Sequence, residues 1–165
     1  MIFVCSMGDL FHEGVPDDFI NKVFTVMTSP MSGANHHTYL MLTKRPDRIL
    51  KGHAERFKDW PNIWLGVTVE NQEMADKRIP ILLQIPAAVR FVSVEPMLEA
   101  VDLLNNGYLG GCIYCGICLE ESPKTCIERD AKIDWVICGG ETGPKARPMH
   151  PDWARTLRDQ CQEAG

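Results

Sequence analysis

Five short apolar runs, each closed by a few polar or charged residues, limit most strongly how this 165-residue chain can fold. We expect strands at residues 2–5, 38–42, 63–69, 89–94 and 133–138. Continuous apolar runs of this length are typical of strands that are buried on both faces, and such strands belong to parallel sheets. The sequence therefore predicts an α/β fold.

Helical patterns separate the predicted strands. The first helix is expected to begin near Pro16, with Asp17 and Asp18 in its first turn and apolar positions 19, 20, 23, 24 and 27. A second begins at Pro46 with apolar positions 49, 50, 54 and 57, and a third spans residues 71–78. Pro80 is expected to kink or restart that third helix, because proline lacks the amide hydrogen. A last helix begins at Pro151, with apolar positions 153, 154, 157 and 161.

Strands that alternate with helices indicate βα units joined by right-handed crossovers. Five such units are too few for an eight-stranded barrel, so the chain forms either an open sheet or part of a (β/α) barrel of the TIM type. We treat residues 1–165 as a single α/β domain, an incomplete barrel.

Composition excludes several classes of protein. The net charge of −5 argues against a general basic surface for nucleic acid. No apolar stretch reaches the ~18 residues of a membrane span, and the first residues do not form a signal peptide. The sequence therefore predicts a cytoplasmic protein without a membrane segment.

The polar groups that follow the strands are candidates for a ligand site. The carboxyl ends of parallel strands meet on one face, which is where α/β enzymes bind their ligands. We expect an unidentified small molecule or nucleotide to bind there. The candidate ligand-binding residues are Asp9, Lys44, Arg45, Glu70, Glu95, Gly139, Gly140 and Glu141.

Each candidate also has a structural interpretation. Lys44, Arg45 and Arg48 suit a phosphate or carboxylate, and equally a solvated loop. Glu70 and Glu95, in the similar segments VTVEN and VSVEP, suit acid–base chemistry or cation binding if their strands are neighbours. Alternatively, one of these carboxylates pairs with Arg45 or Arg90.

Two further features at the strand ends have a second interpretation. Asp9 and His12 form a possible polar pair, although such a histidine is more often a surface residue. The segment Gly139-Gly140-Glu141 allows close backbone approach to a ligand, or is simply a tight turn.

A cysteine-rich stretch interrupts the alternation at residues 105–131, and we interpret it as a metal-binding insertion. Its cysteines have the spacing C-x2-C-x2-C-x7-C, which suits structural zinc or an iron–sulfur cluster, with uncoordinated thiols as the third possibility. The predicted metal ligands are Cys112, Cys115, Cys118 and Cys126. The remaining three cysteines are expected to be buried.

Four segments together are similar to a known family. They are SMGDLFHEGVPDDFI (6–20), LTKRPDR (42–48), NIWLGVTVENQEMADKRIPILLQIPAAVRFVSVEPML (62–98) and DWVICGGETGPKARPMHPDWARTLRDQC (134–161). They resemble phage and bacterial proteins of unknown function that are related to the radical-SAM barrel enzymes. The segment Gly139-Gly140-Glu141 also resembles the Gly-Gly-Glu that holds the methionine amine in radical-SAM enzymes, although there it follows an early strand.

The resemblance implies a radical-SAM-like barrel enzyme, with S-adenosylmethionine and a [4Fe-4S] cluster only in a longer form. Longer members begin with a three-cysteine motif, which this chain does not contain, and end with a phenylalanine-rich strand. A partner chain that completes the barrel is therefore a further expectation. The alternative is a non-catalytic, zinc-stabilised binding module in a phage or mobile element.

Overall fold

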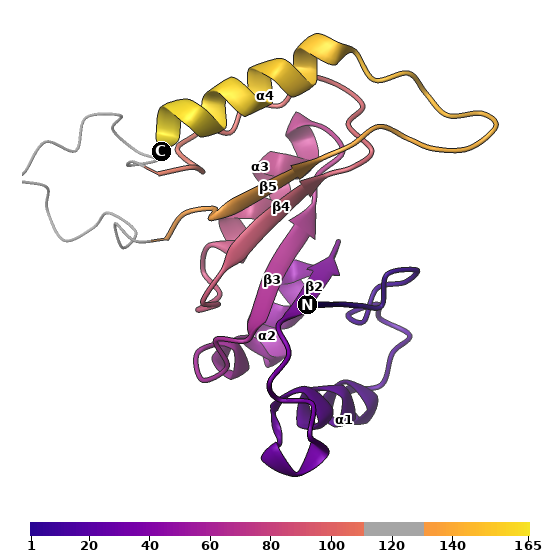
Figure 1. Cartoon of the computed structure of the whole chain (residues 1–165), viewed down its shortest axis with the longest axis vertical. Helices are drawn as coiled ribbons and strands as arrows, with labels where there is room; N and C mark the ends of the chain where they lie inside the picture. Colours follow the sequence, from indigo (N-terminus) through magenta and orange to yellow (C-terminus); the bar gives the residue numbers. More distant parts are fainter. Residues whose placement is uncertain (111–130) are drawn as a thin grey trace, which may run out of the picture.

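The computed structural model describes residues 1–110 and 131–165, and within them the predicted α/β architecture is present. Five strands alternate with helices, as Figure 1 shows. The strands are β1 (Ile2–Val4), β2 (Tyr39–Thr43), β3 (Ile63–Thr68), β4 (Arg90–Val94) and β5 (Trp135–Cys138). The α-helices are α1 (Asp17–Thr28), α2 (Pro46–Gly52), α3 (Gln72–Leu82) and α4 (Pro151–Ala164), and two short 3-10 helices span Pro30–Ser32 and Ala54–Phe57.

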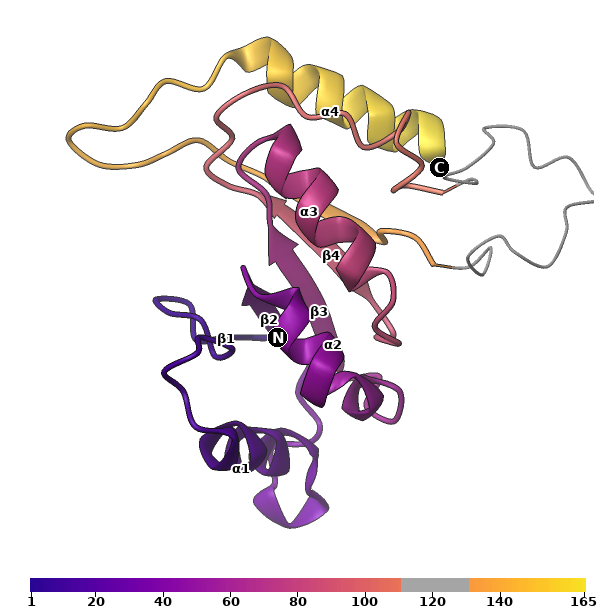
Figure 2. The same ribbon diagram turned by 180° about the vertical axis from the view of Figure 1, so that it is seen from behind.

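The sheet keeps the order of the chain. All neighbours pair in parallel, in the order β1-β2-β3-β4-β5. Because each right-handed crossover then turns the same way, the helices gather on one side of the sheet. Figure 2 shows α2 and α3 in front of the strands, and from the opposite side, in Figure 1, neither helix covers β3 and β4.

The main core lies between the sheet and the helices. Ile63, Leu65 and Val67 alternate along β3 and are fully buried, and Val92 and Val94 of β4 join them. From α1 and α3 the core receives the fully or nearly fully buried side chains Ile20, Phe24, Met27, Ile79 and Leu82. This burial fixes the register, since a shift by one residue would expose the whole set.

The opposite side of the sheet, called the open face below, is also apolar. Its members alternate with the core residues: Phe3, Leu40, Leu42, Trp64, Phe91, Trp135 and Ile137. The Trp64 and Trp135 rings pack edge to face with centroids 6.2 Å apart, and Phe91 lies 5.8 Å from Trp135. Phe3 and Trp135 remain 41% and 40% exposed. Sheet edges β1 and β5 have no further strand beside them in the described residues, so the sheet is open there, and a closed barrel is not seen.

Several details differ from the sequence expectation. Helix α3 runs through Pro80 to Leu82, because Ile79 and Leu82 on either side of the proline are fully buried and their packing offsets the lost hydrogen bond. The second helix divides at His53, whose ring is buried beside Phe11. Phe19 is 53% exposed rather than part of the core.

The predicted insertion at residues 105–131 and its four cysteines, Cys112, Cys115, Cys118 and Cys126, lie outside the described residues except at the flanks. The segment before these residues is bonded to α3 at Tyr108, whose hydroxyl donates to Asp76 at 3.0 Å. Burial, with this hydrogen bond, raises the pKa of Tyr108 to about 12. In the described stretches, no helix is both long and apolar enough to cross a membrane.

Candidate functional site

The candidate residues lie at the carboxyl ends of the strands, where the parallel topology places them on one end of the sheet. Lys44, Glu70 and Glu95 each stand one or two residues beyond β2, β3 or β4. They form two groups with separate partners, one beyond β1–β3 and one beyond β4–β5.

Asp9 is the centre of the first group. Its carboxylate accepts hydrogen bonds from the Phe11 amide at 2.9 Å, the Thr43 hydroxyl at 2.9 Å and the Lys44 amide at 3.0 Å. Arg45 adds an ion pair, with Nη1 3.1 Å from Oδ2. This one side chain therefore ties the loop after β1 to the end of β2. Its predicted partner, His12, instead accepts a hydrogen bond from the Gly14 amide.

Glu70 extends this group to the end of β3. One carboxylate oxygen pairs with Lys44, and the other accepts from Arg78 Nη1 at 2.8 Å. Burial opposes the charge, but the Lys44 hydrogen bond and the Arg78 charge outweigh it, so the pKa of Glu70 is lowered. The predicted alternative of a structural ion pair is therefore realised with Lys44 and Arg78, not with Arg45 or Arg90.

Arg78 and Thr43 are site residues that the sequence interpretation missed. Arg78 also donates to the Thr68 carbonyl at 2.7 Å, and its side chain is only 12% exposed. Helix α3 therefore places a largely buried cation at the strand ends. The signal that points to it is helical spacing, because Arg78 stands about two turns after Asn71, which caps the start of α3 and directly follows Glu70.

Arg48 does not join Lys44 and Arg45. It donates to the carbonyls of His12 and Val15 and forms an ion pair with Asp17. Arg48 therefore connects α2 to the β1–α1 loop. His53 lies 3.5 Å from the same Asp17, and burial together with the Arg56 charge lowers the pKa of His53.

The second group consists of Glu95 and Gly139. A Cβ atom added at Gly139 would lie 3.0 Å from the Glu95 carboxyl group, so the glycine leaves room for this carboxylate. Burial and the charge of Glu95 raise the pKa of the neighbouring Cys138 thiol. Among the described residues, the Glu95 carboxylate has no hydrogen-bond or ion-pair partner, and this distinguishes it from Asp9 and Glu70.

Glu141 belongs to neither group. It accepts from the backbone and side chain of Arg147 at 2.7 to 2.9 Å, within the loop between β5 and α4. The Arg147 side-chain hydrogen bonds lower the pKa of Glu141 to about 2. Gly140 lies near Met149, with 3.5 Å between an added Cβ and the Met149 Cβ.

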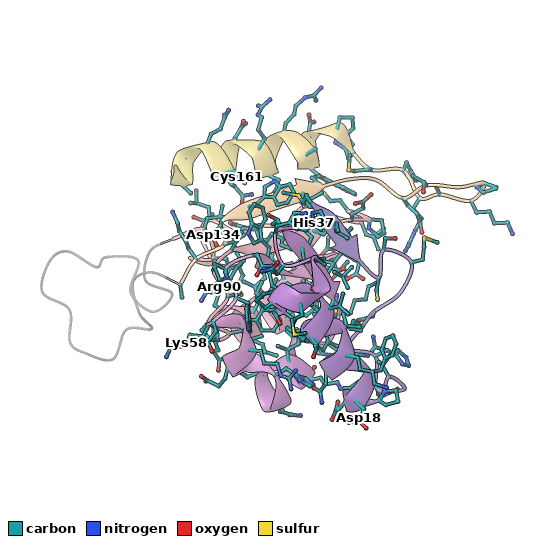
Figure 3. All side chains as sticks on the ribbon, turned by 60° about the horizontal axis from the view of Figure 1, so that its bottom comes forward. Asp18, His37, Lys58, Arg90, Asp134 and Cys161 are labelled. Carbon is teal, nitrogen blue, oxygen red and sulfur yellow. The ribbon has the colours of Figure 1, made fainter. Side chains whose placement is uncertain are left out.

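The opposite end of β4 and β5 carries a different polar pair. Asp134 accepts from the Arg90 amide at 2.8 Å, and Figure 3 shows these two residues beneath α4. The Arg90 side chain donates instead to the Ile85 carbonyl at 3.0 Å. Arg90 is not a partner of Glu70 or Glu95, because it stands at the start of β4 rather than at its end.

A cavity of about 350 Å³ opens beside the first group. Both apolar and polar side chains line it. The lining residues are Phe3, Cys5, Ser6, Gly8, Asp9, Leu42, Thr43, Lys44, Arg45 and Thr68.

The described cysteines do not form a ligand set. The expectation that they are buried is wrong: Cys5 and Cys138 are exposed at opposite edges of the sheet, and Cys161 is half-buried in α4, where Figure 3 labels it on the side that turns toward the sheet. Within residues 1–110 and 131–165, no group of three or more metal-ligating side chains is found.

In the comparison with protein families, a family model matches the chain over residues 1–165. The matching family is described as "Protein of unknown function (DUF5131)". No curated protein and no solved structure matches the chain significantly.

Proposed function

The chain belongs to the family described as "Protein of unknown function (DUF5131)", and we propose that it forms the larger part of a radical-SAM-like β/α-barrel enzyme that binds a small molecule at its strand ends. The observation that carries this proposal is the order of the sheet. Five parallel strands follow chain order, as in a barrel, whereas doubly wound sheets reverse their order at a switch point.

The open face supports the barrel interpretation. Its aromatic residues line the side of the sheet that a barrel encloses, and Phe3 and Trp135 stand at the two edges. A further strand-bearing segment, in a longer form or in a partner chain, would pair with these edges and cover the face. The phage or mobile-element context rests on the resemblance of the sequence segments.

S-adenosylmethionine is the ligand that the resemblance implies, and Glu95 supports it. The molecule carries an amine and a sulfonium. A carboxylate that lies beside a glycine and has no partner within residues 1–110 and 131–165 suits either cation. The cysteines of the described residues do not fit a [4Fe-4S] cluster, because they are separated from one another. We therefore derive no step through a cluster in this chain.

Titration calorimetry with S-adenosylmethionine tests the proposal. We expect Glu95→Gln and Gly139→Ala each to weaken binding roughly tenfold, the first by removing the charge and the second by displacing it. Glu141→Gln is the matched control, since its carboxylate pairs with Arg147 outside both groups. Absence of binding, or equal binding by all four proteins, would sink the proposal.

A second candidate function is a non-catalytic, zinc-stabilised binding module. The spacing of Cys112, Cys115, Cys118 and Cys126 favours it, with an iron–sulfur cluster as the alternative. Metal analysis of anaerobically purified protein separates the two: about one zinc per chain supports the module, and iron with sulfide supports redox chemistry. Cys115→Ser should lose the metal while the α/β core stays folded, and unchanged metal content in this variant would exclude the site.

A further inference from the structure

The two carboxylates of the first group of strand-end residues already accept hydrogen bonds from the protein itself. Asp9 accepts from two backbone amides, one hydroxyl and one guanidinium, which fills the roughly four acceptor positions of a carboxylate. Both oxygens of Glu70 are likewise bonded, one to Lys44 and one to Arg78.

Within the part of the chain that the structure describes, the cations of the same group retain N–H donors that bind no protein atom. Lys44 uses one of the three N–H bonds of its ammonium on Glu70, and Arg45 uses one of the five in its guanidinium on Asp9. Both side chains line the 350 Å³ cavity, and they are 50% and 34% exposed. With Arg78 behind Glu70, three cations face two carboxylates, so the group is net positive.

The remaining lining completes a site for a particular kind of ligand. Ser6 also lines the cavity, and its hydroxyl has no hydrogen-bond partner in the described part of the chain. Phe3 and Leu42 supply apolar lining. The cavity is larger than a single oxyanion, so there is room for an anionic group and part of the organic molecule that carries it.

We propose that this cavity binds the oxyanion end, a phosphate or carboxylate, of a small organic ligand, with Lys44 and Arg45 donating to the oxyanion and Phe3 contacting the organic part. Arginine and lysine beside an already neutralised carboxylate pair offer donors without an excess of negative charge. The inference deepens the proposed function, because it assigns the anionic end of a ligand whose cationic end would lie at Glu95.

The position of the site in the fold supports this assignment. Lys44 and Arg45 follow β2 directly. The Lys44 amide and the Arg45 guanidinium donate to Asp9, and the Lys44 ammonium donates to Glu70, so both side chains are held in place before any ligand binds. A preorganised donor pair loses less side-chain entropy when it binds an anion. Arg48 takes no part, because it does not line this cavity and its guanidinium bonds to the β1–α1 loop and to Asp17.

The experiment measures binding of inorganic phosphate, phenyl phosphate and benzoate to the full chain at low salt, by titration calorimetry. We expect phenyl phosphate or benzoate to bind more tightly than inorganic phosphate, because the phenyl ring adds the contact with Phe3. Whichever of the two binds more tightly identifies the oxyanion as phosphate or carboxylate.

Variants then locate the binding. Lys44→Gln and Arg45→Lys should each weaken binding roughly tenfold, and Arg147→Gln, which removes an exposed cation outside the cavity, should leave it unchanged. Circular dichroism checks that each variant is folded, and Arg45→Lys keeps a cation for Asp9. Equal binding by all four proteins would mean non-specific attraction and overturn the proposal, as would absence of binding by every probe.

The experiments distinguish a failure of the oxyanion site from a failure of the proposed function. Gly139→Ala should weaken S-adenosylmethionine but not phenyl phosphate or benzoate, because Gly139 lies beside Glu95 and does not line the cavity. Loss of the anion probes with S-adenosylmethionine binding retained refutes only the oxyanion site. The reverse result refutes only the assignment of the strand ends to S-adenosylmethionine.

Discussion

Glu70 shows how a single side chain combines structure with electrostatics. It is 15% exposed, and its two oxygens join a cation after β2 to a cation on α3. Its pKa is lowered in the folded protein, so its ionised form is favoured by folding. The stability that it contributes is therefore present above the ordinary carboxyl pKa and is lost as the pH falls through the lowered value.

We predict that Glu70→Gln lowers the free energy of unfolding at pH 7 by about 1–2 kcal/mol, because two charge-assisted hydrogen bonds are lost. The difference from the parent chain should shrink as the pH falls below about 4.5. Urea denaturation at several pH values measures it. Glu141→Gln serves as control, since its partner Arg147 is exposed and its effect should be much smaller. A difference that does not change with pH would contradict the prediction.

At the scale of elements, the contact between β3 and β4 on the open face depends on the absence of a side chain. Gly66 lies in β3 beside Phe91, and an added Cβ would meet the Phe91 ring at 2.4 to 2.6 Å. The ring is fully buried, so it cannot move without disturbing its contact with Trp135.

Gly66→Ala should therefore destabilise the protein by about 1–3 kcal/mol, as expected when a packed site is overfilled. Adding Phe91→Leu should recover part of this loss, and the double-mutant cycle measures the coupling of the two residues. Gly52→Ala is the matched control. It ends α2 with open space around it, so we expect no loss and a gain of up to about 1 kcal/mol. Additive effects of the Gly66 and Phe91 substitutions would refute the contact.

At the scale of the whole molecule, both edges of the sheet are apolar. Edge strands normally carry charges or bulges that prevent pairing, yet β1 is Ile-Phe-Val, with Ile2 and Phe3 about 40% exposed on its two faces. A groove of about 400 Å³ beside β1, lined by Ile2, Val4, Phe19, Val23 and Val26 among others, continues this surface on the helix side. Such a surface indicates an interaction site.

We predict that the isolated chain binds a hydrophobic dye and that Phe3→Ser with Phe19→Ser reduces the fluorescence by about half or more, because these are large exposed members of the surface. Met31→Ser provides the control: Met31 is 97% exposed in the 3-10 helix before β2, outside the groove. Dye fluorescence at background level, or an equal decrease in Met31→Ser, would show that the β1 edge is not a hydrophobic interaction site.

The alternation of strands and helices could be predicted from the sequence, because it depends on local periodicity and on prolines and acidic residues at helix starts. The same local signals placed the candidate residues at strand ends. Partner choice could not be predicted. Asp9 pairs with Arg45 rather than His12, and Glu70 with Lys44 and Arg78, because the parallel register and the packing of α3 decide which side chains meet.

The course of α3 through Pro80 has the same explanation, since burial of Ile79 and Leu82 against the sheet outweighs a local preference. Thus the sequence by itself determined the α/β class and the end of the sheet at which polar groups gather. Only the tertiary structure decided which carboxylates are neutralised and that Glu95 has no partner among the described residues, because ion pairs depend on distances between elements far apart in the chain.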